Sequence, residues 1–370
     1  MASAKKREPL FHIVKRGAIE RKKAWLIRIV AVVAALVFNG IVALVITGEN
    51  PFNIYGTMVN GALGSPTKLW KLLFDLSLLL CVSLAVTPAF KMRFWNIGAE
   101  GQALMGGLAA AVCMLKLTGN IPNWLMIPVM LICSIVAGAI WGLIPALFKA
   151  KWGTNETLFT LMMNYIAMQI ISYYVNIWAN PKGTGQIRPM NEGGANVGVG
   201  HIPKLFGQQY LITILVVFAL TAIVYVYLKH SKQGYEISGV GESANTARSI
   251  GINVKKVIIR TMIISGALCG IAGFLIVAGS DHTISSETVA GRGFTAIMVS
   301  WLAKFNPIVM ILTSFILVFM SKGAGGVAKD LGLNEAFSDI LAGIIIFFII
   351  GSEFFINYQI KFREKEVNSK

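Results

Sequence analysis

Charged side chains are scarce in this sequence of 370 residues. They make up only 14% of the chain, whereas 55% of the residues are hydrophobic. Soluble domains carry roughly 25% charged residues, so a globule of this size would lack the polar surface that it needs in water. The composition therefore excludes an ordinary cytosolic enzyme and indicates a protein that crosses a membrane many times.

Cysteine and histidine are also sparse, with four residues of each type. The cysteines lie inside apolar stretches and form no CxxC pair, which predicts buried thiols rather than disulfides or metal ligands. The histidines stand far apart in the sequence and form no zinc or haem motif. Because no Ser/His/Asp, paired-carboxylate or His-metal set stands out, the sequence predicts no catalytic residue, no metal site and no cofactor held by this chain.

Acidic residues are the rarer charged type. The chain has 17 Asp and Glu against 33 Lys and Arg, so its formal net charge is +16. In a soluble protein this excess would suggest nucleic-acid binding, but in a membrane protein it belongs in the cytoplasmic loops. The positions of the cations therefore test the membrane interpretation.

A membrane-spanning helix needs about 20 mostly apolar residues. Nine stretches qualify, and we expect the first to be a retained helix rather than a cleaved leader. They are Ala24–Thr47, Leu72–Phe90, Glu100–Leu117, Trp124–Phe148, Leu158–Ala179, Tyr210–Leu228, Thr261–Ser280, Asn306–Met320 and Ala336–Tyr358. A tenth stretch, Phe294–Ala303, has only ten residues. It is either a span completed by its flanks or a re-entrant half-helix.

The charges at the two ends of the chain decide between an odd and an even number of crossings. Eight Lys and Arg lie in the first 23 residues and four in the last ten, so both termini belong in the cytoplasm. We therefore predict an all-α polytopic membrane protein with about ten transmembrane helices, in which Phe294–Ala303 counts as a crossing. This topology places 23 of the 33 cations on the cytoplasmic side. It argues against nucleic-acid binding and favours contact between the N-terminal segment and anionic membrane lipid.

The predicted topology divides the chain into three parts. These are a basic cytoplasmic segment (residues 1–23), a transmembrane permease domain (24–358) and a basic cytoplasmic tail (359–370). The long loops, 181–209 outside and 229–260 inside, are too short for an ATP-hydrolysing domain, and no GxxxxGK[ST] motif occurs. The cluster Gly323–Gly326 lacks the lysine, and we interpret it as a flexible outer loop. Any ATP chemistry must come from a partner chain.

Polar residues near the ends of two predicted spans are candidates for a translocation path. They are Asn96, Glu100, Gln102, Glu156, Thr160 and Asn164. Such side chains are costly in lipid and face water or protein, and the last three are spaced to lie on one side of a helix. Two alternatives stay open. Asn96 and Glu100 could form an interfacial helix start, as N-cap and first-turn acid, and the second group could be a plain interhelical hydrogen-bond seam.

The cytoplasmic loop 229–260 contains a run of small residues between Gly241 and Gly251. Gly251 is a plausible helix stop, so the run predicts a short helix whose small-residue face fits the cleft of a partner. The alternative is a solvated connector, although the loop is long for one.

Four motifs, taken together, resemble one protein family. They are the Asn96–Gln102 run, the Asn155–Tyr165 run, the Gly241–Ile252 loop and the glycine-rich Ile264–Gly273 run. They are similar to ABC-importer permeases of the ribose, branched-chain amino-acid and nucleoside type, and most similar to the nucleoside or simple-sugar subgroup. The resemblance covers roughly Leu72 to Phe354.

This resemblance implies the membrane-spanning permease subunit of an ATP-driven importer in the bacterial cytoplasmic membrane, with nucleosides or sugars as substrate. It implies three protein partners: a cytoplasmic ATPase that holds ATP and Mg²⁺, an extracytoplasmic substrate-binding (lipo)protein, and a second, non-identical permease. The coupling segment would dock on the ATPase. Its residues are Gly241, Glu242, Ser243, Ala244, Asn245, Ala247, Arg248, Gly251 and Ile252. The chain departs from the family pattern at Ser243, Ala244 and Thr246, and at the bulky Trp301.

A different class of function is an ion-coupled secondary transporter of a small polar solute. It would use intramembrane carboxylates as proton or sodium sites, for which Asp75, Glu100 and Glu353 are candidates. The long cytoplasmic loop favours the importer, and no pair of matching halves with interrupted helices is evident. The sequence does not choose between nucleoside and sugar, or between a homodimer and a heterodimer.

Overall fold

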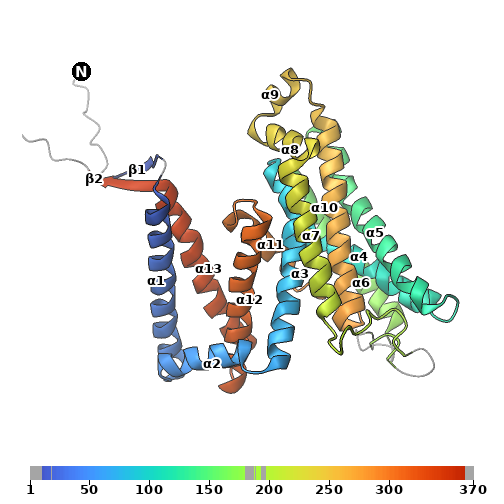
Figure 1. Cartoon of the computed structure of the whole chain (residues 1–370), viewed down its shortest axis with the longest axis horizontal. Helices are drawn as coiled ribbons and strands as arrows, with labels where there is room; N and C mark the ends of the chain where they lie inside the picture. Colours follow the sequence, from blue (N-terminus) through green and yellow to red (C-terminus); the bar gives the residue numbers. More distant parts are fainter. Residues whose placement is uncertain (1–10, 18, 180–186, 188, 193–196, 363–370) are drawn as a thin grey trace, which may run out of the picture. The chain divides into compact units, whose positions relative to one another are not determined.

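The computed structural model describes residues 11–17, 19–179, 187, 189–192 and 197–362. The described chain is almost entirely helical, with one two-stranded sheet (Figure 1). It forms two compact units, one made of residues 1–65 and 319–370 and the other of residues 66–318. The sequence does not predict this division, because every long helix carries the same apolar signal.

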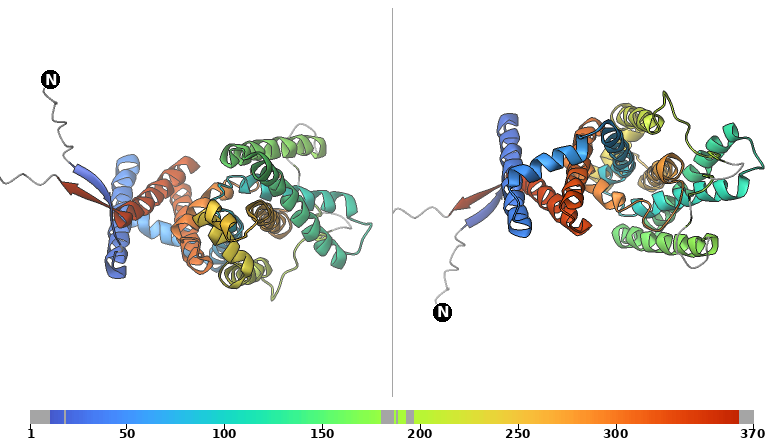
Figure 2. Two further views of the ribbon diagram at one scale, coloured as in Figure 1. Left: turned by 90° about the horizontal axis from the view of Figure 1, so that it is seen from above. Right: turned by 90° about the horizontal axis from the view of Figure 1, so that it is seen from below.

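The 66–318 unit is a helical bundle. Its elements are α3 (Pro66–Lys91), α4 (Ala99–Leu117), α5 (Asn123–Trp152), α6 (Glu156–Trp178), α7 (Leu211–His230), α8 (Lys232–Glu242), α9 (Ala244–Ser249), α10 (Val254–Ile276), the π-helical turn η2 (Val277–Asp281) and α11 (Arg292–Leu302). Helix α10 is central, because it packs against α3, α4 and α5, and Figure 2 shows it end-on between its neighbours. Helix α12 (Pro307–Asp330) follows and runs into the other unit.

Two GxxxG patterns bring α5 and α10 into backbone contact. Gly138 on α5 lies so close to Gly266 on α10 that a Cβ atom on either residue would overlap the carbonyl oxygen of the other. Small residues at such crossings let membrane helices gain van der Waals contact without a hydrophobic driving force. The glycines are therefore what allows α5 and α10 to cross in backbone contact.

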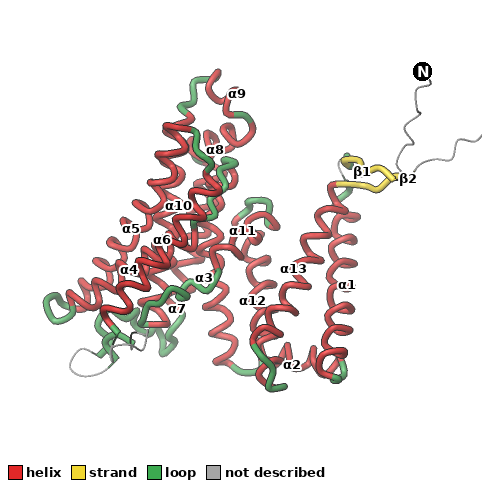
Figure 3. Tube along the Cα trace, turned by 180° about the vertical axis from the view of Figure 1, so that it is seen from behind, coloured by secondary structure: helices red, strands yellow, loops and turns green. Residues whose placement is uncertain are grey.

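The other unit contains the two ends of the described chain. Its elements are β1 (Phe11–Lys15), α1 (Arg21–Thr47), α2 (Pro51–Leu63), α13 (Glu335–Asn357) and β2 (Tyr358–Phe362). Helices α1 and α13 pack together, with an ion pair of 2.6 Å between Arg28 and Glu353. Strands β1 and β2 pair antiparallel, so the start of α1 and the end of α13 lie at the same end of this unit (Figure 3).

The glycine cluster Gly323–Gly326 is helical, and our interpretation of it as a flexible outer loop is wrong. It lies inside α12, where a Cβ atom on Gly61 of α2 would come within 2.9 Å of the Gly326 Cα. Glycines that permit a close helix crossing and glycines that loosen a loop look alike in a sequence.

Among the described residues, eight helices are long and apolar enough to cross a membrane. They are α1, α3, α5, α6, α7, α10 with η2, α12 and α13. The other two predicted spans are also helices, α4 and the eleven-residue α11. The architecture is that of an α-helical polytopic membrane protein, and the count of ten crossings stays a prediction. The sheet β1–β2 was not predicted.

Candidate functional site

The break between α3 and α4 is held by a buried amide network. Asn96 is completely buried, and its Nδ2 donates to the Ser265 Oγ of α10 at 3.1 Å. The Asn96 Oδ1 accepts from the Gly98 backbone N–H and from the Gln102 Nε2, each at 3.1 Å. These bonds satisfy backbone and side chains where the helix is interrupted, which is required inside a membrane protein.

The polar stripe on α6 holds the same break from the other side. The Asn164 Oδ1 accepts from the Gly101 N–H, and its Nδ2 donates to the Ile97 carbonyl, both at 2.9 Å. The Thr160 Oγ1 accepts from the Ile97 N–H at 3.2 Å. Both side chains are at most 2% exposed. The stripe therefore clamps the irregular backbone that precedes α4.

Glu100 holds the start of the short helix α11. Its two carboxylate oxygens accept the backbone N–H groups of Gly291 and Gly293 at 2.8 and 2.6 Å. Helix α11 has no capping side chain of its own, and a carboxylate at a helix N-terminus satisfies free N–H groups and complements the helix dipole. Beside it, Arg292 forms an ion pair of 2.9 Å with Asp75 of α3. The carboxylates of α3 and α4 thus fix α11 in place.

The structure brings five of the six predicted path residues into one buried arrangement around the α3–α4 break. The sixth, Glu156, is at its edge, where it forms an ion pair of 2.6 Å with Lys149 and its carbonyl accepts from the Thr160 Oγ1. Of the two alternatives, the contacts of Thr160 and Asn164 have the form of the interhelical seam. Glu100 does lie in the first turn of α4, but the assignment of Asn96 as N-cap is wrong, because Gly98 occupies that position. A role of these residues on the translocation path stays a prediction. Sequence reasoning missed Arg292, a lone cation between two glycines.

The cytoplasmic loop 229–260 contains two short helices, α8 and α9, and the coupling segment comprises the end of α8, the whole of α9 and the residues up to Ile252. Ser243 separates them and caps α9, because its side chain accepts the Thr246 N–H. Two of the predicted docking residues are buried. Gly241 lies against the Lys91 carbonyl at the end of α3, where any Cβ atom would overlap it, and Ala247 is 1% exposed. These two positions hold the segment against its own chain.

The outward face of α9 is formed by other residues. Asn245 and Arg248 are exposed, with Arg248 donating to the Asn245 Oδ1 at 3.1 Å. Ile250 follows directly and is 59% exposed. Sequence reasoning did not select Ile250, because a single apolar residue in a polar loop is common and carries no signal of its own.

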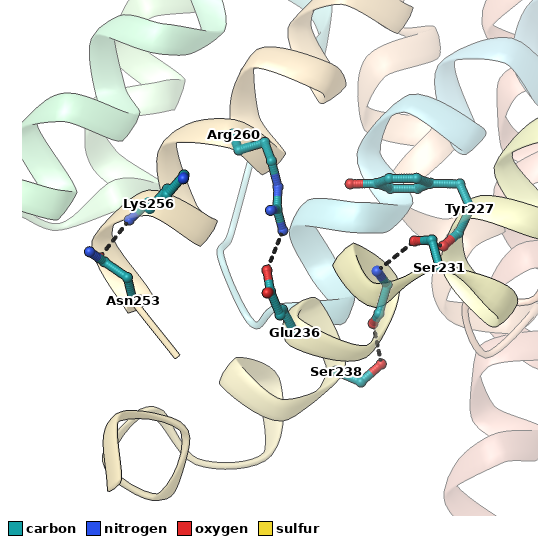
Figure 4. A network of polar contacts seen from close by, with 8 residues as sticks. Tyr227, Ser231, Glu236, Ser238, Asn253, Lys256 and Arg260 are labelled. Atoms are coloured by element: carbon teal, nitrogen blue, oxygen red, sulfur yellow. Dashed lines mark hydrogen bonds and ion pairs between the residues drawn. The ribbon is translucent and has the colours of Figure 1, made fainter. Parts of the chain in front are cut away.

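The coupling segment is attached to the bundle by polar contacts (Figure 4). Glu236 of α8 forms an ion pair of 2.9 Å with Arg260 of α10. The Ser231 Oγ caps α8 by accepting the Gly234 N–H at 2.9 Å, and the Asn253 Oδ1 caps α10 by accepting the Lys256 N–H at 3.1 Å. The ion pair thus ties α8 to α10, the central helix of the bundle.

The chain matches a known family. The family described as the branched-chain amino acid transport system / permease component matches residues 69–350. The match covers both the amide network and the coupling segment.

Individual relatives match along most of their length. A glucose ABC transporter permease protein of Haloferax volcanii is 30% identical over 90% of this chain and 88% of its own. A guanosine ABC transporter permease protein of Bacillus subtilis is 27% identical over 93% of this chain and 97% of its own. A nucleoside ABC transporter permease protein of Lactococcus lactis is 28% identical over 88% of this chain and 90% of its own.

Proposed function

We infer the function from one point that is established: this chain belongs to the branched-chain amino acid transport system / permease component family. It is a permease subunit of an ABC importer and a multi-pass protein of the cytoplasmic membrane. It is not an enzyme, because the relatives are permease subunits and ATP hydrolysis belongs to a partner ATPase. The ion-coupled alternative is therefore set aside.

We propose that the imported substrate is a nucleoside. The observation that carries this proposal is that permeases named for guanosine and for nucleosides match this chain nearly from end to end. The relative named for glucose makes a sugar the competing substrate. An extracytoplasmic substrate-binding lipoprotein would deliver the solute, a second permease would complete the path, and the ATPase would hold ATP and Mg²⁺.

Uptake into proteoliposomes that contain the whole complex tests this function. With ATP inside, labelled guanosine or uridine should accumulate, vanadate should stop the uptake, and a protonophore should not. Accumulation of glucose without nucleosides would overturn the substrate. Uptake that survives vanadate but collapses with the ion gradient would contradict the importer mechanism.

We also propose ten crossings with both termini in the cytoplasm. The β1–β2 pairing supports an even number, because it joins the segment before α1 to the segment after α13. The course of α11 supports a complete crossing. It runs along α3 from the Arg292–Asp75 ion pair to Trp301, whose ring centroid lies 6.2 Å from that of Phe90. These contacts are 15 residues apart on α3, about 22 Å of helix. The irregular residues 284–291 would cover the rest.

We propose that α9 docks on the ATPase through its outward face, with Ile250 as the apolar anchor and Arg248 beside it. Ile250→Asp should reduce the ATPase that co-purifies at least tenfold, since the loss of one buried anchor costs about 2 kcal/mol or more. Phe206→Asp is the matched control, because Phe206 is an 89% exposed apolar residue in the predicted outer loop. Equal ATPase recovery from the two variants would contradict the docking role.

A further inference from the structure

A cavity of about 570 Å³ lies where α3 and α11 end, and α8 forms its third wall. Small-molecule sites occupy about 300–1,000 Å³, so this space is large enough for a ligand. The three walls contribute aromatic and polar side chains, among them Phe90, Trp95, Trp301, Phe305, Ser238 and Glu242.

The aromatic side chains form a cluster of their own. Trp95 and Trp301 stack with 5.5 Å between their ring centroids, and Phe90 and Phe305 pack edge-on against Trp301. The two indoles nevertheless stay 45% and 47% exposed. Tryptophan is typical of the boundary between membrane and water, where one ring meets apolar and polar groups together.

The length of α3 places the cavity at the depth of the lipid headgroups. Helix α3 has 26 residues, about 39 Å of helix, whereas the hydrocarbon core of a bilayer is about 30 Å thick. The last turn of α3, with Phe90 and Lys91, therefore reaches the headgroup region on the side that we propose to be cytoplasmic.

Two opposite charges line the cavity without forming an ion pair. Arg93 lies just beyond the end of α3 and Glu242 at the end of α8. Neither side chain has a hydrogen-bond or ion-pair partner among the residues that the structure describes. Lys91 also lines the cavity and donates to the Leu228 carbonyl at 3.2 Å, which leaves two of its three N–H groups for a ligand. A ligand with both a negative and a positive group would give Arg93 and Glu242 a partner each.

The backbone at Arg93 is in a conformation that favours glycine. Its φ is 59°, and the Phe94 N–H donates to the Ala89 carbonyl at 2.9 Å, as in the Schellman motif that often ends a helix. Glycine closes such a turn with the least strain. Strained positions of this kind cluster at ligand sites, so an arginine here points to a use of its side chain.

We propose that this cavity (the headgroup site) binds a zwitterionic phospholipid with a primary ammonium group, namely phosphatidylethanolamine. Arg93 and Lys91 bind its phosphate, and Glu242 accepts hydrogen bonds from its ammonium group. The Trp95 and Trp301 rings pack on the glycerol and the first methylene groups. A trimethylammonium headgroup has no N–H to donate to Glu242, and an anionic headgroup leaves this carboxylate without a cation. The lipid thereby ties α8 to the ends of α3 and α11. The headgroup site does not depend on which solute is imported.

Lipid retention tests the headgroup site. The whole complex is placed in nanodiscs that contain equal parts of phosphatidylethanolamine, phosphatidylcholine and phosphatidylglycerol, and native mass spectrometry identifies the lipid that stays bound on release. We expect phosphatidylethanolamine to be retained in about tenfold excess over phosphatidylcholine, the factor that corresponds to one hydrogen bond to a charged group. Glu242→Ala should remove this preference. Glu287→Ala is the matched control, because Glu287 is an exposed glutamate outside the cavity lining, and it should keep the preference.

Arg93→Gly tests the phosphate contact without endangering the fold. Glycine suits the left-handed backbone at this position, so the variant should melt no lower than the wild type and yet retain about tenfold less phosphatidylethanolamine. Lys304→Gly is its matched control. Lys304 has a φ of 50° at the end of α11 but is not part of the cavity lining, so lipid retention should stay at the wild-type level.

Each contrary result overturns a defined part of the proposal. Equal retention of phosphatidylethanolamine and phosphatidylcholine by the wild type overturns the headgroup site, and a preference for phosphatidylglycerol overturns the zwitterionic ligand. Equal retention by Arg93→Gly and Lys304→Gly overturns the phosphate contact. A preference kept by Glu242→Ala overturns the ammonium contact. The uptake assay for nucleosides and glucose decides the substrate separately, so a failure of either proposal is recognised without the other.

Discussion

The role of Glu100 can be decided by removing its carboxylate. In the structure both oxygens accept backbone N–H groups at the start of α11, from Gly291 and Gly293. The side chain is 2% exposed, so water cannot replace it. If Glu100 acts as this cap, Glu100→Ala destabilises the folded protein. If it lines the path, the same substitution mainly removes transport.

The expected size of the effect follows from these contacts. Leaving two buried N–H donors unpaired costs about 1–3 kcal/mol each, and losing the charge at the helix N-terminus costs up to about 2 kcal/mol more. Relief of the buried carboxylate's desolvation offsets part of this cost, which leaves a net loss of about 2–4 kcal/mol for Glu100→Ala. Glu100→Gln keeps one acceptor oxygen and should lose about half as much.

Thermal unfolding followed by tryptophan fluorescence measures the difference. A loss of about 2–4 kcal/mol should lower the Tm by about 4–16 °C, at roughly 2–4 °C per kcal/mol for a unit of this size. Glu287→Ala is the control, because Glu287 is an exposed glutamate near the same loop, and it should melt like the wild type. The reasoning would be refuted if Glu100→Ala melted within 1 °C of this control and still abolished transport.

Two further predictions concern packing and pH. Gly266→Val should lower the yield of folded permease and its Tm more than the control Gly343→Val does. A side chain at Gly266 overlaps the Gly138 carbonyl, whereas Gly343 has open space around it. An equal Tm for the two variants would contradict the close contact between α5 and α10. Burial, and next the stacked His201 ring at 3.6 Å, lower the pKa of His282 below its usual 6.5. As the pH falls, the His282 side chain takes up a proton in the unfolded chain before it does so in the folded chain. The free energy of unfolding should therefore fall as the pH drops through about 6.5. His282→Gln should reduce the Tm difference between pH 7.5 and pH 5.5, and an unchanged difference would exclude this origin.

Hydrophobicity was enough to predict the helices, because each long apolar run has only one way to satisfy its backbone in lipid. It could not predict the sheet β1–β2, since the strands Phe11–Lys15 and Tyr358–Phe362 lie at opposite ends of the sequence. It also could not separate a packing glycine from a loop glycine, which is why the interpretation of Gly323–Gly326 failed.

For the coupling segment, composition identified the segment but not its outward side. Small residues were interpreted as the surface that meets the ATPase, yet Gly241 and Ala247 are small because they touch their own chain. Gly241→Glu would therefore disturb the fold as well as any docking, and it is a poorer test than Ile250→Asp. The reason for a small residue depends on which neighbour is close, and only the structure supplies that neighbour.

The same limit explains the two polar stripes of α6. Thr160 and Asn164 lie on one side of the helix, while Tyr165 and Gln169 begin about 100° further round it. Both stripes break the apolar pattern, so a sequence marks both as polar surfaces that avoid lipid. Packing against the start of α4 gives every polar atom of the first stripe a partner and leaves the second exposed. The structure therefore shows the first stripe packed against its own chain, which the sequence left as one of two alternatives.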